Sequence, residues 1–520
     1  LKLLPCRYCQ TWSNMCRALL LPLGQVFLLL CSSPSAVSLR AISRPSHASL
    51  ICHPEEQRPA AAAGQLVRAE PRQCQQRQPE AASCEFINGP SSFLRKFGSF
   101  WQSKRCPLTP ASIANATRPQ GFEGSRLRLR EVAAKLNAGQ KVNITVLGPS
   151  MTKGTQSYRA WPLRLGDLFE KAGIAVKIKN LARGGSTTRW AVGAFHDLKT
   201  TLQDADVILT DYGLNDREPA FAEDHDHVNG AEGVKMAHHN LMELLISLPQ
   251  RPAVIDIQTF VDTPLILAQS NSEVSVPTNN CGSVDVTKYN HWSVNQELGI
   301  PMVSYIHAVC HTNRTYWMME YKDGDSEGSP HPGAITHDLL ARVVLGLFLG
   351  EMDKVCLEGV SGAEHPNRRQ ELLDSQVKCL TQPTTAYDAQ YGNSAMVPLS
   401  YERENWRFGE DVPGKPGWIT EAPTQLYVKH GGDISFQVET RGGWLQFEYL
   451  GTYEKIGHVT VWLDDAEPTA SNSCDMNGFW ADYTSQSKFS LFKTVLPPGN
   501  HTVKIRSYGK KFKLLGITAC

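Results

Sequence analysis

Four short stretches of this chain hold the residue types that acyl-group chemistry requires. Ser150 follows a Gly-Pro turn and precedes a predicted helix, a position that exposes a hydroxyl group as a nucleophile. Gly185 lets a backbone N–H come close to an anionic oxygen, and Asn215 can offer its side-chain amide to the same oxygen. His331, directly before a proline and a predicted helix, is suited to act as a general base. Together they predict attack by a serine on a carbonyl carbon.

Alternating strands and helices must position these residues. Short apolar runs predict strands at 141–147, 175–179, 206–210, 253–258 and 302–305. Helix-length stretches lie between and after them, at 158–172, 187–202, 231–248, 285–298 and 334–349. This alternation predicts an α/β domain with a parallel five-stranded sheet covered on both faces. Such sheets bind ligands at the carboxyl ends of their strands, where the chemistry-bearing stretches lie.

The order of the motifs resembles that of the SGNH (GDSL-type) hydrolases over roughly residues 140–350. The matching parts are Gly-Pro-Ser150, the Asn180 to Gly185 loop, Gly-Leu-Asn215-Asp and His331-Pro. The resemblance implies a flavodoxin-like three-layer α/β/α domain and a carboxylic ester hydrolase that works through an acyl-enzyme. It implies Ser150 as the nucleophile and His331 as its base. It further implies an oxyanion hole formed by the backbone N–H groups of Ser150 and Gly185 and by the Asn215 side chain. No cofactor and no metal are expected.

Two positions depart from the family pattern. The usual Gly-Asp-Ser reads Gly-Pro149-Ser, at a position outside the four catalytic functions. The family's acidic residue stands three residues before the histidine, where this chain has Gly328. Asp325, Glu327 or a backbone carbonyl could orient His331 in its place. Without an orienting group we expect little or no activity, because losing such an aspartate costs on the order of 10⁴ in kcat in a serine protease.

Three further groups near the motifs hold residue types that could do chemistry, but each favours another interpretation. Ser326 lies in a literal Gly-Asp-Ser-Glu-Gly, but its lead-in is polar and a histidine follows too soon for a nucleophile elbow, so we do not expect it to be the nucleophile. His337 is expected to pack or to cap a helix. The Asp-His-Asp-His run at 224–227 holds metal-ligand types, but its spacing favours a solvated rim.

The chain before this domain has the pattern of a leader followed by a stem. Arg17, an apolar run over 18–31 and small residues at 36 and 38 predict a signal peptide spanning residues 1–38. The run is shorter than the about 18 residues that a membrane anchor needs. We therefore expect a protein secreted or held in the lumen of the secretory pathway, with the cell surface as an alternative. Residues 39–120 predict a basic, low-complexity stem.

The boundaries of the domains that follow are predicted from changes in composition and in the pattern of apolar residues. The hydrolase domain is placed at 121–352 and a polar connector at 353–395. Residues 396–520 alternate apolar and polar side chains and predict an all-β, jelly-roll-like sandwich. Its strands are expected at 434–440, 444–449, 459–464, 492–496, 503–508 and 512–518. Two interpretations of its tryptophans, core packing and stacking on sugar rings, stay open for Trp418, Trp444, Trp462 and Trp480.

Removing the leader leaves 10 of the 14 cysteines, since 14 − 4 = 10, and an even count in a secreted chain favours disulfides. The pairs that bracket single segments are Cys84–Cys106, Cys281–Cys310, Cys356–Cys379 and Cys474–Cys520. Sequons predict glycans at Asn115, Asn313 and Asn500, whereas Asn143 lies within a predicted strand and is expected to be buried and unmodified.

Together these features predict a secreted serine ester hydrolase that removes an O-acyl group, most plausibly acetyl, from a glycan. The expected partner is an acylated glycan or a small ester, with a polysaccharide contact through the carboxy-terminal domain. Two alternatives stay open, a catalytically degenerate scaffold that binds carbohydrate and an O-acyltransferase that uses the same serine. The 52 basic and 51 acidic residues give a net charge of +1, so a dedicated nucleic-acid binder is not expected. Neither the oligomeric state nor the esterified alcohol can be read from the sequence.

Overall fold

In the computed structural model of the chain, the described residues lie between 108 and 520. Gaps in the description fall at 155–158, 217–230, 260–289, 313–318, 322–323, 327–330, 366–381, 390–395, 421–431, 465–466, 470–471, 480–484, 493–495 and 509. The predicted signal peptide, nearly all of the predicted stem, the 224–227 run, Glu327, Gly328 and the predicted pair Cys84–Cys106 lie outside the described residues.

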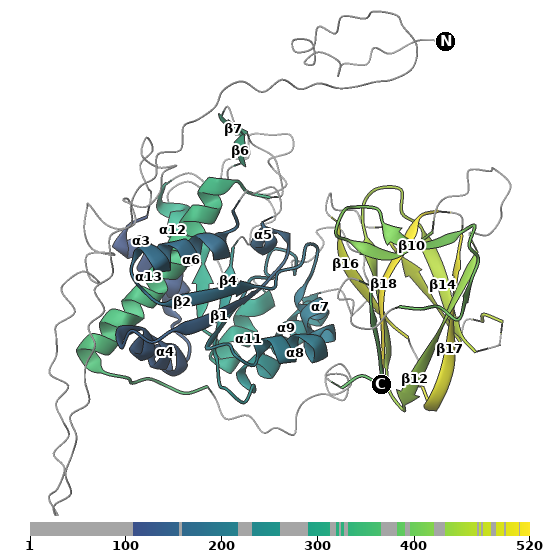
Figure 1. The fold of residues 1–520 in the computed structure, drawn as a ribbon, viewed down its shortest axis with the longest axis horizontal. Coiled ribbons are helices and arrows are strands. Elements are labelled where there is room, and N and C mark those ends of the chain that lie inside the picture. Colours follow the sequence, from purple (N-terminus) through teal and green to yellow (C-terminus); the bar gives the residue numbers. More distant parts are fainter. Residues whose placement is uncertain are drawn as a thin grey trace, which may run out of the picture. The chain divides into compact units, whose positions relative to one another are not determined.

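A parallel five-stranded sheet forms the centre of the first domain (Figure 1). Its order is β2-β1-β3-β4-β5, and every neighbouring pair is parallel. The strands are β1 Val142–Leu147, β2 Val176–Asn180, β3 Val207–Thr210, β4 Ala253–Gln258 and β5 Met302–Ser304. All five lie within one residue of the predicted ranges, and the flavodoxin-like order is confirmed. The strand order reverses between β1 and β3, and such a switch point is where ligands bind in these sheets.

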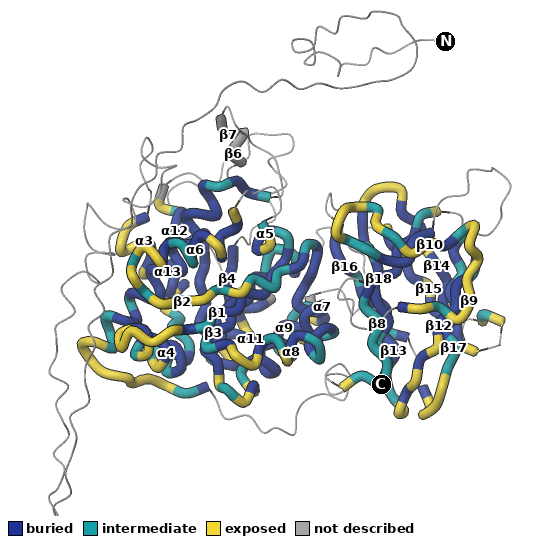
Figure 2. Tube along the Cα trace, viewed as in Figure 1, coloured by how far each residue is buried: buried dark blue, intermediate teal, exposed yellow. Residues whose placement is uncertain are grey.

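Helices cover both faces of this sheet and bury its apolar side chains (Figure 2). One core contains α3 Pro110–Thr117, α4 Leu127–Asn137, α6 Trp161–Lys171, α12 Tyr305–Val309 and α13 Ala334–Glu358. The other core contains α7 Thr188–Gly193, α8 Phe195–Leu202, α9 Ala231–Ile246 and α11 Asn290–Leu298. Alternate strand residues enter opposite cores, as Val146 and Leu147 do, because successive side chains of a strand point to opposite faces. The predicted three-layer arrangement is confirmed.

The structure differs from the predicted boundaries at three places. Helix α3 lies within the segment predicted as an unfolded stem, and its Thr109 cap and buried Ile113 show that the folded domain begins before residue 121. The helix predicted over 187–202 is broken at Ala194, which separates α7 from α8. Helix α13 runs to Glu358, past the predicted end of the domain. Among the described residues, none of the helices is both long and apolar enough to cross a bilayer.

Two antiparallel sheets form the second domain and confirm the predicted β-sandwich. One sheet has the order β10-β11-β18-β13-β16, with β8 also paired to β18, and the other has the order β15-β14-β17-β12-β9. The strands of the first are β8 Thr385–Asp388, β10 Trp406–Glu410, β11 Pro416–Thr420, β13 Leu445–Gly451, β16 Gln486–Leu491 and β18 Phe512–Ala519. Those of the second are β9 Ser400–Tyr401, β12 Asp433–Arg441, β14 His458–Leu463, β15 Ser473–Asn477 and β17 Pro498–Ser507. Strand β8 lies in the segment predicted as a connector.

Several finer predictions about the sandwich are corrected. The strand expected at 492–496 is instead β16, which ends at Leu491, and β17 begins at Pro498, before the strand expected at 503–508. Trp418 and Trp462 are buried, so both are core residues rather than sugar-stacking surfaces. Trp480 lies outside the described residues.

Several positions of the predicted disulfides and sequons fall on described residues, and Asn115 among them lies in helix α3. Cys356 and Cys474 are not in disulfides, so the pairs Cys356–Cys379 and Cys474–Cys520 are wrong. Asn143 lies in β1 as expected, but it is only half-buried and donates its amide to the Asp204 carbonyl (3.1 Å). Asn500 lies in β17 rather than in a loop.

Four shorter elements complete the α/β domain. The 3₁₀ helices Pro119–Gly121 (η2) and Cys310–Thr312 (η6) follow α3 and α12. Strands β6 Met319–Tyr321 and β7 Gly324–Ser326 form a two-stranded antiparallel ribbon, in which Ser326 pairs with Met319. Ser326 is thus the last residue of a short antiparallel ribbon strand and not a residue after a strand of the parallel sheet, which does not fit a nucleophile elbow.

Candidate active site

Ser150 and His331 meet at the carboxyl end of the sheet. Ser150 is the first residue of the short helix α5 Ser150–Lys153, directly after the turn that ends β1. The Nε2 atom of His331, just before α13, lies 2.7 Å from the Oγ atom of Ser150. This is hydrogen-bond distance, and it is the distance a base needs to take the hydroxyl proton.

The turn that presents Ser150 depends on a glycine and on a buried carboxyl group. A Cβ atom at Gly148 would lie 2.4 Å from the Oγ1 atom of Thr152, so a larger residue would push into α5. That hydroxyl donates to Asp211, which also accepts hydrogen bonds from Trp161 Nε1 (3.2 Å) and Thr259 Oγ1 (2.9 Å). Burial raises the pKa of Asp211 to about 7, although these hydrogen bonds act to lower it. Asp211 therefore fixes the nucleophile's helix to the end of β3.

The loop after β2 lies against the nucleophile turn. Arg183 N and Ser186 Oγ both donate to the carbonyl oxygen of Gly148, at 2.9 and 3.2 Å. Gly185 has a φ of +79°, a left-handed conformation that disfavours any side chain, and a Cβ there would lie 3.3 Å from the Ser485 carbonyl oxygen. The sequence therefore needs a glycine at this position for the loop to close over Ser150.

Asn215 is tied to the same loop. Its Nδ2 atom donates to the Ser186 carbonyl oxygen at 2.9 Å. An amide group carries two N–H donors, so one remains to face a bound oxygen. The first-turn N–H of Ser150 has no partner within its helix, as at any helix start. Hydrogen bonds thus link the loops that carry Gly185 and Asn215 to the turn before Ser150, and His331 lies beside the serine. The oxyanion hole itself stays a prediction.

His331 is neutral at physiological pH. Burial lowers the pKa of His331 to about 4, and the nearby ammonium group of Lys415 lowers it further. A neutral ring has a lone pair for the serine proton. The side chain of Asp325 and the whole of Glu327 and Gly328 lie outside the described residues, so their part in orienting His331 stays a prediction.

His337 has the capping role expected for it. Its Nδ1 atom accepts the backbone N–H of Trp161, the first residue of α6, at 3.2 Å. Backbone N–H groups at helix starts lack intrahelical partners, and a buried imidazole here supplies one. His337 therefore fixes α6 against α13 rather than taking part in chemistry.

The loop after β2 also contacts residues of the sandwich. Arg183 Nη2 donates to Glu448 Oε1 at 2.9 Å, and both side chains are buried. Ser487 N donates to the Gly185 carbonyl oxygen at 2.9 Å. Burial raises the pKa of Glu448 to about 7, although the Arg183 charge opposes this. The second domain therefore helps to hold the glycine that is predicted to line the oxyanion hole.

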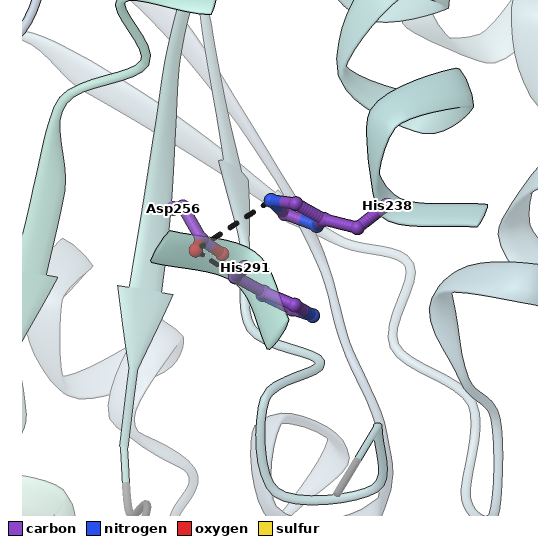
Figure 3. Close-up of side chains that lie close together, drawn as sticks. All are labelled: His238, Asp256 and His291. Carbon is purple, nitrogen blue, oxygen red and sulfur yellow. Dashed lines mark hydrogen bonds and ion pairs between the residues drawn. The ribbon is translucent and has the colours of Figure 1, made fainter. Parts of the chain in front are cut away.

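A second buried cluster lies beneath these loops (Figure 3). His238 of α9, Asp256 of β4 and His291 of α11 offer ligand-type atoms within 4.8 Å of one another. The two imidazole rings are stacked, with centroids 3.6 Å apart and planes 9° apart. Lone pairs of parallel rings run side by side and do not converge on one ion at about 2.0–2.1 Å. The arrangement fits a network of ion pairs better than a metal site.

Sequence reasoning missed most of the residues that support the site. His291, Asp211 and Lys415 carried no motif that singled them out, and Asp216, the last residue of the Gly-Leu-Asn215-Asp motif, was given no role; each gains its importance from contacts across the fold. One signal was present. Asp256 interrupts the apolar strand run AVIDIQ, and an acid in a buried strand requires a partner.

Comparison with known proteins identifies the fold. No protein-family model matches the chain, and no curated protein sequence matches it. The crystal structure of a two-domain esterase active on acetylated mannans aligns with 76% of this chain and 95% of its own, at 16% identity and a TM-score of 0.50. The chain has the fold of a two-domain esterase. The same esterase crystallized with mannopentaose gives a TM-score of 0.48 over the same shares of both chains, also at 16% identity.

The two-domain esterase fold thus accounts for both the α/β domain and the sandwich. A single-domain neighbour, a catalytic mutant of an acetylxylan esterase from Geobacillus stearothermophilus, covers 41% of this chain and 94% of its own, at 12% identity and a TM-score of 0.28. At that score the likeness carries no argument. The reaction that this chain carries out is therefore inferred from the residues of its own site.

Proposed function

We propose that this protein is a serine ester hydrolase that removes an O-acyl group, an acetyl group in particular, from a glycan. The observation that carries the proposal is the 2.7 Å contact between Ser150 Oγ and His331 Nε2 at the switch point of the sheet. Asn215 is hydrogen-bonded to the loop that carries Gly185, and that loop is hydrogen-bonded to the turn before Ser150. This linkage supports the proposal that Gly185 and Asn215 supply the donors that an oxyanion requires.

The geometry supports an acyl-enzyme mechanism. Ser150 Oγ attacks the acyl carbonyl carbon while His331 Nε2 takes the hydroxyl proton. The N–H groups of Ser150 and Gly185 and the Asn215 amide stabilise the negative oxygen that forms. The C–O bond to the alcohol then breaks, and His331 returns the proton to the leaving oxygen. Water, activated by His331, hydrolyses the acyl-enzyme in the same way and releases the acid.

A glycan is the substrate class that the supporting facts favour. The two-domain esterase that shares this fold acts on acetylated mannans. The predicted signal peptide at residues 1–38 would bring the protein to the secretory lumen or outside the cell, where such polysaccharides lie. A contact between the sandwich and a polysaccharide is part of the same proposal.

Acetate release from acetylated mannan tests the proposal, with 4-nitrophenyl acetate as the small-ester substrate. The wild type is expected to turn over both, and Ser150→Ala to lose both. Ser326→Ala is the matched control, because Ser326 lies in a literal Gly-Asp-Ser but belongs to the two-stranded ribbon and not to the turn after β1. Activity that survives Ser150→Ala would contradict the proposed nucleophile.

The same assay separates the alternatives. Wild-type protein that binds the mannan but releases no acetate would be a carbohydrate-binding scaffold. Acetyl groups that appear on an added oligosaccharide rather than as free acetate would indicate an acyltransferase. Either result would contradict the proposed hydrolase function.

A further inference from the structure

His291, one of the residues of the buried cluster in Figure 3, contacts Asp216 in the loop after β3. His291 Nε2 lies 3.0 Å from Asp216 Oδ2, and His291 Nδ1 lies 3.2 Å from Asp256 Oδ2. All three side chains are buried. Asp256 lies in β4, Asp216 lies in the loop after β3, and His291 is the second residue of α11, so one ring joins three elements.

Two facing carboxylates favour the charged form of this ring. Only an imidazolium carries N–H groups on both nitrogens. The Gln258 amide nitrogen lies 2.8 Å from Nδ1 and could donate to a neutral ring. A neutral ring, however, would bury two carboxylates beside it without the charge that balances one of them. Burial alone would lower the pKa of His291, but Asp256 and Asp216 raise it to about 9.

The stacked neighbour stays neutral. Burial lowers the pKa of His238 to about 3, and the charge of His291 acts in the same direction. His238 Nε2 lies 2.8 Å from the Asn295 side-chain oxygen, and Asn295 Nδ2 donates to Asp256 at 2.7 Å. His238 is therefore as buried as His291, but its contacts lead to Asp256 and not to Asp216.

Asp216 connects His291 to the loops of the candidate active site. Its two carboxylate oxygens accept the backbone N–H of Thr188 at 3.0 and 3.3 Å, at the start of α7. The residue before it, Asn215, donates to the Ser186 carbonyl oxygen. Adjacent residues thus tie the loop after β3 to the loop that carries Gly185, at two points two residues apart.

We propose that His291 is a positioning residue, a buried imidazolium that holds Asp216 and thereby fixes the register of the two loops that form the oxyanion hole. The role rests on the proposed esterase function. It does not require His291 to touch the substrate. Among the residues that the structure describes, Asp216, Asp256 and His238 are the titratable groups that face the ring.

The test compares two equally buried rings. His291→Gln keeps an amide that can reach Asp216 but removes the charge, and His238→Gln is the matched control. His291→Gln is expected to lower kcat for 4-nitrophenyl acetate by about 10-fold to 100-fold with little change in KM, because the loss of one oxyanion donor costs about 10²- to 10³-fold. His238→Gln is expected to lower the melting temperature while keeping kcat within about 3-fold.

Two further readouts separate positioning from simple destabilisation. Wild-type kcat is expected to fall as the pH rises past about 9, where His291 loses its charge, and this alkaline limb should be absent in His291→Gln. Amide hydrogen exchange at Thr188 should speed up in His291→Gln and not in His238→Gln. Equal kcat losses in the two variants, or unchanged exchange at Thr188, would overturn the role of His291. The exchange experiment needs no turnover, so it decides the matter even if the wild type proves inactive and the proposed function fails.

Discussion

The Nε2 atom of His331 lies 2.7 Å from the Oγ atom of Ser150, although 181 residues separate them in the chain. Groups that act as one unit lose nearly all of their effect when either is removed. Ser150→Ala, His331→Ala and the double variant are therefore expected to show the same loss, about 10³-fold or more in kcat. Steady-state kinetics with 4-nitrophenyl acetate measures it. If the two single losses multiplied in the double variant, the two side chains would be acting independently.

The acid limb of the pH profile reports on His331. Burial and Lys415 lower the pKa of His331 to about 4, and the base must be neutral. We expect kcat/KM to stay level from neutral pH downward and to be halved near pH 4, rather than near the usual histidine value of about 6.5. Profiles taken in buffers of constant ionic strength check this. A midpoint near 6.5 would mean that His331 is solvated in the working enzyme.

Lys415 is expected to shift the acid limb of the pH profile. Removing its charge in Lys415→Met takes away one of the two causes that lower the His331 pKa, so the acid limb should move to higher pH. Burial, the larger cause, remains, and the shift should therefore be partial. Lys177→Met, at an exposed position of the edge strand β2, is the control and should leave the profile unchanged. If neither variant changes the pH profile, Lys415 does not act on His331.

Asn215 is expected to act on turnover more than on binding. Asn215→Ala should lower kcat by about 10²- to 10³-fold with a smaller change in KM, which is typical of a lost oxyanion donor. Asn137→Ala removes an amide that likewise donates to a backbone carbonyl, Met352 O at 3.0 Å, but far from the site in sequence and on α4. It should leave kcat unchanged. A similar loss in both variants would assign the Asn215 effect to stability.

The Arg183–Glu448 pair is expected to stabilise the fold far more than an exposed pair does. Breaking a buried pair by removing one partner costs about 3–5 kcal/mol, so Glu448→Ala should lower the unfolding free energy by that order. Asp433→Ala removes the partner of Arg506 at a partly exposed site and should cost about 1 kcal/mol or less. Urea unfolding measures both. Equal losses of unfolding free energy in the two variants would show that the contact between Arg183 and Glu448 does not hold the loop after β2.

The sequence predicted the elements whose signals are local. The predicted apolar runs became the five strands, because a buried parallel strand such as β3, β4 or β5 is apolar on both faces, whereas the edge strand β2 alternates. Ser150 could be found because it follows a strand, and His331 because it precedes a helix. It also predicted that His337 would pack or cap. These features depend on neighbours in the chain or on one repeated topology.

The contacts that complete the site could not be predicted in this way. His291 gains its role only because α11, β4 and the loop after β3 bring it between Asp256 and Asp216, which lie 35 and 75 residues away. Arg183 reads as an ordinary loop arginine until Glu448 is placed beside it. The missed strand β16 and the wrong cysteine pairs have the same cause, since pairing between distant segments leaves little local trace.

Covalent labelling by a fluorophosphonate probe tests the central claim most directly, because it requires a nucleophile, its base and an oxyanion hole at once. Peptide mapping of the labelled wild type should place the phosphonyl group on Ser150, and Ser150→Ala should take up no label while Ser326→Ala is labelled like the wild type. Label on any other residue, or none on protein that is folded and pure, would contradict the account.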